Sequence, residues 1–186
     1  FALTGLGGAA IRGACQLDCK RLLPYLGLLS VRVHSAALIE SVLRYYFKHD
    51  ALFIEQWVER QVEVSQVQRN DLGRTNSVLG EDLVLGRRVA DRSGKFRVHV
   101  RALGWQRFHD FLPAGKACEP LRSLVRLTLR DPLEYDLRLV MAQGQIRALH
   151  IGENTVCRLG WTTWLGRERA DGVVTLTGNF IRDEWT

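Results

Sequence analysis

Several short patterns in the chain contain residue types that can do chemistry. Gly5, Gly7 and Ala10 fit the G-x-G-x-x-A form of a dinucleotide-binding turn, in which glycines let the backbone approach a pyrophosphate. A functional turn also needs a strand before it and an acidic residue at the end of the next strand. Only four residues precede Gly5, and neither Asp18 nor Glu40 stands at such a place. We therefore expect a tight turn of small residues, and a dinucleotide-dependent enzyme is the least favoured function.

The other reactive side chains do not form a catalytic or metal-binding set. The five histidines show neither H-x3-H nor H-E-x-x-H spacing. The four cysteines lack the spacing of a metal knuckle or a disulfide framework, so we expect thiols in a reducing compartment. Glu134 and Asp136 share a strand face with Arg138, which favours a row of ion pairs over catalytic carboxylates. The sequence predicts no enzyme, no cofactor and no metal.

The net charge of +6 is concentrated in one stretch. Between Arg87 and Arg107 there are seven basic residues and one acid, Asp91, so the rest of the chain sums to zero. Such a patch can meet nucleic acid, an anionic membrane or an acidic protein surface. Nucleic-acid binding needs stacking aromatics beside the basic residues, and we expect Phe96 on the opposite strand face. A basic nucleic-acid-binding domain is thus the alternative. We favour a polar contact to an acidic partner surface through Arg87, Arg88, Arg97 and Arg101.

Trp161 and Trp164, followed by Leu165, form the most distinctive apolar cluster. Their spacing of three places both rings on one side of a helical segment. Tryptophan is common at the centre of protein interfaces, and it is also a large core residue. The three residues are therefore candidates for packing against a partner or against another segment of the chain.

Hydrophobic periodicity predicts an alternation of helices and strands. The 186 residues include 46% apolar and 25% charged residues, as in a globular protein, and no apolar run is long enough to span a membrane. Helical spacing predicts helices at about 35–47, 105–112 and 120–130, with Ser35 as the cap of the first, after a Leu-rich helical segment. Alternation predicts strands at about 53–64, 95–102 and 133–141, the last ended by a turn at Gln143-Gly144, and further short strands are expected at 146–151 and 173–177.

The order of these elements repeats along the chain. Helix, strand and a segment with the spacing LG-x4-LG occur twice, and the LG segments lie at 79–86 and 159–166. We expect an α+β fold of two similar helix–strand–Gly-rich units from an internal duplication, with small antiparallel or mixed sheets and extended connections. The predicted domains are a Gly/Leu-rich helical segment at 1–34 and repeats at 35–112 and 113–186. Each repeat would present a similar surface to an equivalent partner.

Six motifs in order resemble one family. Residues 158–166 (RLGWTTWLG) resemble the C-terminal signature of the TssG family of the bacterial type VI secretion system, and residues 133–140 resemble the strand before it. Residues 108–113 with Gly115 resemble its F-x2-FLP-G segment, and residues 79–91 with 94–97 its middle block. Two upstream groups, at 25–29 and within 46–56, match as well. The resemblance covers about residues 1–166, and residues 167–186 carry little of the pattern.

The resemblance implies a cytoplasmic, non-enzymatic wedge protein of a contractile baseplate. Members of the family bind TssF copies and the TssK trimers that dock the baseplate onto the inner-membrane complex, and TssE and other tail components lie nearby. The family chain is longer, so we expect an N-terminal region that is not in this sequence. The implied role includes no nucleic acid and no insertion into the membrane.

Overall fold

The computed structural model describes residues 21, 23–25, 27, 35–71, 73–129, 131–147, 158–164 and 172–178. The chain divides into two compact units. The sheet unit comprises residues 1–56 and 96–186, and the hairpin unit comprises residues 57–95. These two units are defined by packing within the chain, whereas the predicted repeats are defined by similarity between two stretches of sequence. The repeat boundaries expected at 34/35 and 112/113 therefore stay a prediction.

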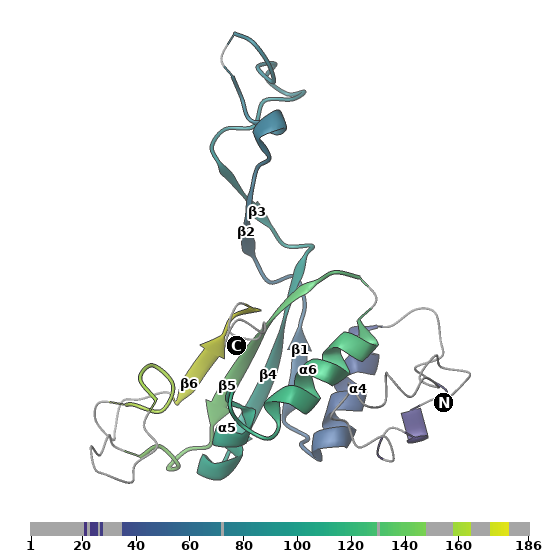
Figure 1. Ribbon diagram of the computed structural model, residues 1–186, viewed down its shortest axis with the longest axis vertical. Helices are drawn as coiled ribbons and strands as arrows, with labels where there is room; N and C mark the ends of the chain where they lie inside the picture. Colours follow the sequence, from purple (N-terminus) through teal and green to yellow (C-terminus); the bar gives the residue numbers. More distant parts are fainter. Residues whose placement is uncertain are drawn as a thin grey trace. The chain divides into compact units, whose positions relative to one another are not determined.

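The sheet unit is built on a four-stranded sheet with the order β1-β4-β5-β6 (Figure 1). Its strands are β1 (Leu52–Glu55), β4 (Lys95–Leu103), β5 (Glu134–Met141) and β6 (Val173–Leu176). β1 pairs antiparallel with β4, and β6 pairs antiparallel with β5. Phe96 stacks on Tyr135 near the start of β4 and β5, and Ala142 N donates to Leu103 O at their ends. These two strands therefore run in the same direction, and the sheet is mixed.

Helices cover one face of this sheet (Figure 1). Among the described residues they are α4 (Ala36–Phe47), α5 (Trp105–Phe111) and α6 (Cys118–Thr128), with a short 3-10 turn, η2 (Leu23–Tyr25). α5 and α6 form the crossover that the parallel strands β4 and β5 require. Ser35 caps α4 by accepting a hydrogen bond from Leu38 N, as predicted. Phe108, Phe111 and the helix-facing strand residues form a single core, which confirms the α+β class.

The outer side of the edge strand β1 is covered by two side chains of α4. Ile54 N donates to Glu40 Oε2 at 3.0 Å. Arg44 Nε donates to Leu52 O at 2.5 Å and also pairs with Glu40 at 2.8 Å. The two side chains thus take hydrogen-bonding positions that another strand would take. Because uncovered strand edges favour pairing between chains, this contact protects β1.

We expect a double variant, Glu40→Ala with Arg44→Ala, to self-associate through the uncovered edge of β1. Loss of the two hydrogen bonds should also lower the free energy of unfolding by about 1–2 kcal/mol. Light scattering against concentration and urea unfolding measure the two effects. Ser41→Ala on the same helix is the control, because its hydroxyl donates to Ala37 O within the helix. A double variant that stays monomeric would contradict the protective role.

The hairpin unit is built on two antiparallel strands. They are β2 (Arg60–Glu63) and β3 (Arg88–Asp91), and a 3-10 turn, η3 (Gln66–Gln68), follows β2. Hydrogen bonds from side chains to backbone carbonyls stabilise the segment between the two strands. For example, Asn76 Nδ2 donates to the carbonyls of Val67 and Arg69. Among the described residues of this unit, only Val58 and Val64 are buried hydrophobic residues. It therefore depends on hydrogen bonds more than on a core.

A polar clamp fixes the base of this hairpin. Ser93 N and Oγ donate to Asp91 Oδ1 at 2.8 and 2.6 Å, and Arg60 Nε donates to Asp91 Oδ2 at 2.8 Å. These bonds, those from Ser93 first, lower the pKa of Asp91 to about 2. A Cβ atom at position 94 would collide with the Arg60 guanidinium, so Gly94 leaves room for the clamp. Asp91 and Gly94 of the sequence motif thus have a structural role.

Three predicted strands differ from the structure. The strand predicted at 53–64 is wrong, because β1 and β2 are separate strands of different units. The break lies at Trp57, whose φ of 61° is incompatible with an extended strand. In β4 the alternation predicts a buried Ala102, but the positive φ of 53° at this residue shifts the pattern by one position. Ala102 is therefore exposed and Leu103 is buried. The strand at 146–151 lies mostly outside the described residues, and 146–147 are not in a strand.

The repeated order of elements appears in the structure with a different arrangement in space. Each series has a helix, a strand, a long connection and an antiparallel strand: α4, β1 and β4, then α6, β5 and β6. Both helices belong to one core, while β1 and β5 run in opposite directions. A rotation that places the pair β1/β4 on the pair β5/β6 has to turn the sheet over, because β1 and β5 run in opposite directions. The same rotation would move α4 to the sheet face opposite α6. Duplication of the whole unit therefore stays a prediction.

Candidate protein-binding surfaces

The first LG segment forms a tight turn that exposes a leucine. Val78 O accepts hydrogen bonds from the backbone N of Glu81 and Asp82, and Val78 N donates to Asp82 Oδ1 at 2.8 Å. Gly80 has a φ of 87°, which favours glycine at this position. The bonds hold Leu79 at the outside of the turn, where it is 85% exposed.

The second LG segment forms the same turn. Arg158 O accepts from the backbone N of Trp161 and Thr162, and Arg158 N donates to Thr162 Oγ1 at 2.8 Å. Gly160 has a φ of 79°, and Leu159 is 92% exposed. Each bond has a counterpart at the same spacing in the first turn. The LG turns, residues 78–82 and 158–162, are therefore matched local structures that each expose a leucine at the same position.

Trp161, within the second LG turn, and Trp164, just after it, pack the turn against the core of the sheet unit. Trp164 lies edge-on to Phe108, with ring centroids 5.8 Å apart, and contacts Trp105 at 6.3 Å. Trp161 is partly buried against the same core, and the Arg158 guanidinium lies 5.8 Å from its ring. Both rings thus make inter-segment contacts, one of the two roles considered for them. Leu165 lies outside the described residues.

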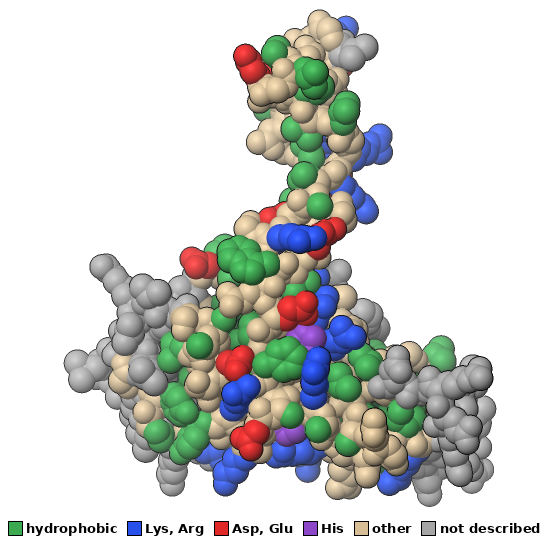
Figure 2. Space-filling model, turned by 180° about the vertical axis from the view of Figure 1, so that it is seen from behind, with side chains coloured by type: hydrophobic (Ala, Val, Ile, Leu, Met, Phe, Trp, Pro, Cys, Tyr) green, Lys and Arg blue, Asp and Glu red, His purple; other side chains and the backbone are tan. Residues whose placement is uncertain are grey.

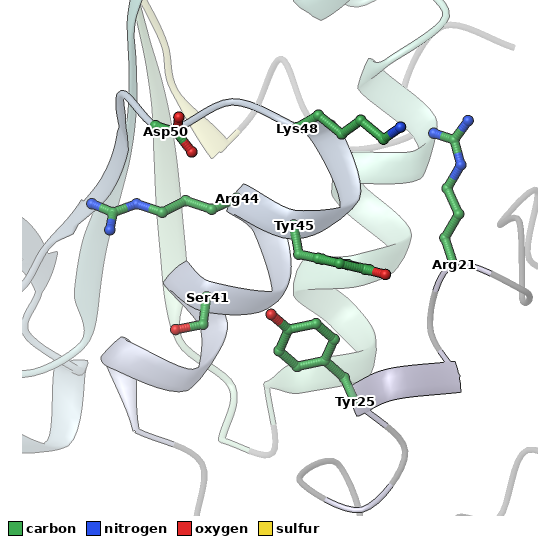
Figure 3. Close-up of a pocket in the computed structure, with 7 residues that line it drawn as sticks. All are labelled: Arg21, Tyr25, Ser41, Arg44, Tyr45, Lys48 and Asp50. Carbon is green, nitrogen blue, oxygen red and sulfur yellow. The ribbon is translucent and has the colours of Figure 1, made fainter.

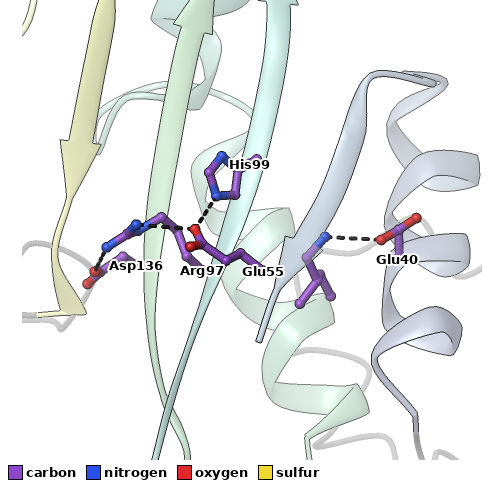
Figure 4. A network of polar contacts seen from close by, with 6 residues as sticks. Glu40, Glu55, Arg97, His99 and Asp136 are labelled. Carbon is purple, nitrogen blue, oxygen red and sulfur yellow. Dashed lines mark hydrogen bonds and ion pairs between the residues drawn. The ribbon is translucent and has the colours of Figure 1, made fainter. Parts of the chain in front are cut away.

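The sheet face opposite the helices carries a chain of polar contacts (Figure 4). His99 Nε2 donates to Glu55 Oε2 at 2.7 Å, and Arg97 bridges Glu55 at 3.2 Å and Asp136 at 3.5 Å. Phe53 stacks on His99 with the ring planes 12° apart. Acidic, basic and histidine side chains are mixed over this face (Figure 2). The contacts link β1, β4 and β5 through their side chains.

The four candidate arginines do not form one uniform basic surface. Arg97 is only 21% exposed and lies between two carboxylates of its own chain. The Arg101 guanidinium is exposed and lies 4.7 Å from the centroid of the Phe53 ring. Arg87 and Arg88 are exposed in the hairpin unit, where Arg88 is opposite Glu63. A contact of these four arginines with a partner stays a prediction. Arg97 in addition links β1, β4 and β5 through its ion pairs with Glu55 and Asp136.

This network predicts a loss of stability in acid. The hydrogen bond from His99, followed by the charges of His99 and Arg97, lowers the pKa of Glu55. Its stabilising effect is therefore fully present above the ordinary glutamate pKa and lost as the pH falls through the lowered value. Urea unfolding between about pH 3 and pH 7 should show a smaller acid loss for Glu55→Gln than for the wild type. The exposed Asp131→Asn is the control, and an unchanged acid limb in Glu55→Gln would contradict this role.

In the described part of the chain we find neither a membrane-spanning helix nor a metal site. No helix there is long and apolar enough to cross a bilayer. No group of three His, Cys, Asp or Glu side chains there can hold a metal ion. Cys118 is a buried thiol whose pKa is raised by burial. The other three cysteines and the Gly5–Ala10 turn lie outside the described residues.

The structure adds surface residues that sequence patterns did not single out. Leu79 and Leu159 belong to recognised motifs, but their spacing does not indicate that both are exposed. Trp57 is 67% exposed at the start of the hairpin unit. In the strand predicted at 53–64, the apolar face consists of even-numbered residues, whereas Trp57 is apolar and odd-numbered. This departure from the alternation is a sequence signal for the break in the strand.

Comparison with known proteins identifies the family. The family model described as "Type VI secretion, TssG" matches residues 1–166. A cryo-electron microscopy structure of a TssK-TssF-TssG baseplate subcomplex contains a chain 16% identical to this one, with a TM-score of 0.70 over 95% of this chain and 75% of that chain. A type VI secretion baseplate complex contains another, 18% identical, with a TM-score of 0.60 over 95% of this chain and 50% of that one.

At these identities the structural matches show a shared fold. The chain spans half the length of the second of these two structural relatives. No curated protein sequence matches the chain. The family model, in contrast, covers most of the sequence and includes both LG turns. The chain therefore belongs to the TssG family of type VI secretion proteins.

Proposed function

We propose that the protein is a structural subunit of the type VI secretion baseplate and that it joins TssF and TssK. Membership of the TssG family supports this role. The structural relatives belong to baseplate assemblies, one of which contains TssK and TssF. The role needs binding surfaces and no catalytic centre. It places the protein in a cytoplasmic assembly that docks at the inner membrane, with TssE and other tail components as further neighbours.

The observation that carries the proposal is the pair of matched LG turns. Leu79 and Leu159 are exposed on turns with the same hydrogen bonds, so two places on this chain offer the same apolar side chain in the same backbone setting. A solvated leucine gains about 1.5–3 kcal/mol when an interface buries it fully. We infer that each turn inserts its leucine into an equivalent apolar pocket on one kind of partner subunit.

The two turns are positioned in different ways. The second turn is attached to the core by Trp161 and Trp164. The first turn lies in the hairpin unit, which also exposes Leu85 of the same LG segment by 80%. Arg87 and Arg88 follow it directly in the sequence and add charge that can orient an acidic partner. This unit is thus suited to contacting a partner through its surface.

Co-expression of the chain with TssF and TssK from the same secretion system tests the function. We expect the three proteins to co-purify, and native mass spectrometry should show one partner bound at two equivalent places. A chain that purifies alone from this mixture would contradict the baseplate role. A complex with one copy of each partner would retain the baseplate role and contradict the two equivalent LG-turn sites.

A further inference from the structure

A hollow of about 660 Å³ lies in the sheet unit between α4 and the segment that contains η2 (Figure 3). Its lining residues come from both elements: Arg21, Tyr25, Ser41, Arg44, Tyr45, Lys48 and Asp50. Three of these side chains are basic and one is acidic. The hollow belongs to neither LG turn, and the proposed function does not use it.

One side of the hollow is occupied by contacts within the chain. Arg44 pairs with Glu40 at 2.8 Å and donates to Leu52 O, so its guanidinium holds the edge of β1. In Figure 3 this side chain points away from Arg21 and Lys48, toward the side on which Asp50 lies. The positive charge of Arg44 is therefore engaged in the fold.

The other side is cationic. The Lys48 amino group and the Arg21 guanidinium are directed toward the same space, and the Tyr45 hydroxyl points to this side as well (Figure 3). The Arg21 guanidinium also lies 5.8 Å from the centroid of the Tyr46 ring, which helps to orient it. Asp50, the acidic residue of the lining, lies on the opposite side in this view. The two cationic groups thus end beside each other, and the hydroxyl donor lies farther along the same side of the hollow (Figure 3).

Two tyrosine rings form an apolar wall of the hollow. The rings of Tyr25 and Tyr45 lie 5.2 Å apart between centroids and are tilted by 55°. Tyr45 is 48% exposed, so its ring is open to a bound group. An aromatic surface beside charged donors suits a side chain that has methylene groups and a terminal anion. A glutamate side chain has this composition.

We propose that the hollow binds an acidic segment of a partner protein, with one carboxylate held by Arg21 and Lys48 and with the Tyr45 hydroxyl donating to the segment farther along the hollow. Hydrogen bonds between a carboxylate and charged donors are about twice as strong as neutral ones. The volume is within the range of sites for multi-atom ligands and far larger than an inorganic anion needs. The tyrosine wall gives the methylene groups of the segment an apolar surface, which a phosphate ion would not use.

Fluorescence anisotropy with a labelled hexaglutamate peptide tests the proposal on the full chain. Lys48→Glu and Arg21→Glu should each weaken peptide binding about tenfold or more, because each replaces an attraction by a repulsion. The matched control is Arg126→Glu, which makes the same charge change on an exposed residue of α6 outside the hollow. Its affinity should stay within about twofold of the wild type.

A second variant and a competitor distinguish this site from general charge attraction. Tyr45→Phe keeps the ring and removes the hydroxyl, so we expect about a threefold to tenfold loss of peptide affinity with an unchanged circular dichroism spectrum. Inorganic phosphate at equal ionic strength should compete no better than chloride. Equal losses in Lys48→Glu and Arg126→Glu, no peptide binding by the wild type, or displacement by phosphate would each overturn the proposal. These results are separate from co-purification with TssF and TssK, which tests the baseplate role.

Discussion

A chain carrying both Leu79→Asp and Leu159→Asp should bind none of the partner that occupies the LG turns, while each single variant should keep one of two partner copies. Both leucines are more than four-fifths exposed, so the substitutions leave the core intact. Loss of a buried leucine costs an interface about 1.5–3 kcal/mol, which is about 10- to 100-fold in affinity. An aspartate adds the cost of placing a charge in an apolar pocket. Native mass spectrometry of complexes formed with TssF and TssK measures the number of copies.

The control for this experiment is Val67→Asp. Val67 is 87% exposed in the same hairpin unit, and the change introduces the same charge outside the LG turn. We expect it to retain both partner copies. Equal loss of partner in Val67→Asp and Leu79→Asp would show that the whole hairpin surface binds and would contradict a specific role of the turn. Full retention of partner by the double variant would contradict the role of both leucines.

The second large effect is expected from Arg97→Met, which should lower the free energy of unfolding by about 2–4 kcal/mol. Asp136 is 2% exposed and pairs with Arg97 at 3.5 Å, so the variant removes a cation from a buried carboxylate. The contact with Glu55 at 3.2 Å is lost as well. The matched control is Arg92→Met. Its ion pair with Glu59 is exposed, and loss of such a pair costs about 0–1 kcal/mol.

A double variant separates the ion pair from simple packing. Arg97→Met with Asp136→Leu removes both charges and should recover much of the stability, because apolar replacement of a whole buried pair is often close to neutral. Urea unfolding of the single and double variants gives the coupling energy. If Arg97→Met unfolds at the same urea concentration as the wild type, the pair with Asp136 has no stabilising role.

Several local structures could be predicted from the sequence because their causes lie within a few residues. Ser35 and the apolar spacing after it predicted α4 and its cap. The alternation of apolar and polar residues predicts Phe96 in the core and Arg97 on the opposite face of β4. The structure follows this alternation up to Val100. The LG spacing indicated two matching segments, and the turns at 78–82 and 158–162 have the same hydrogen bonds. In the cap and in both turns the decisive bonds join residues no more than four positions apart.

The tertiary structure alone decided what joins distant parts of the chain. Arg97 meets Asp136 and Glu55 across the sheet, and no periodic pattern encodes which strand lies next to which. The positive φ of Trp57 breaks the chain between β1 and β2 at the start of a separate unit, although the apolar alternation predicts one continuous strand. The sequence by itself determined the family, the helices and the turn chemistry. Which leucines are exposed and which arginine is buried depended on long-range packing, because burial is a property of neighbours that the chain brings together only when it folds.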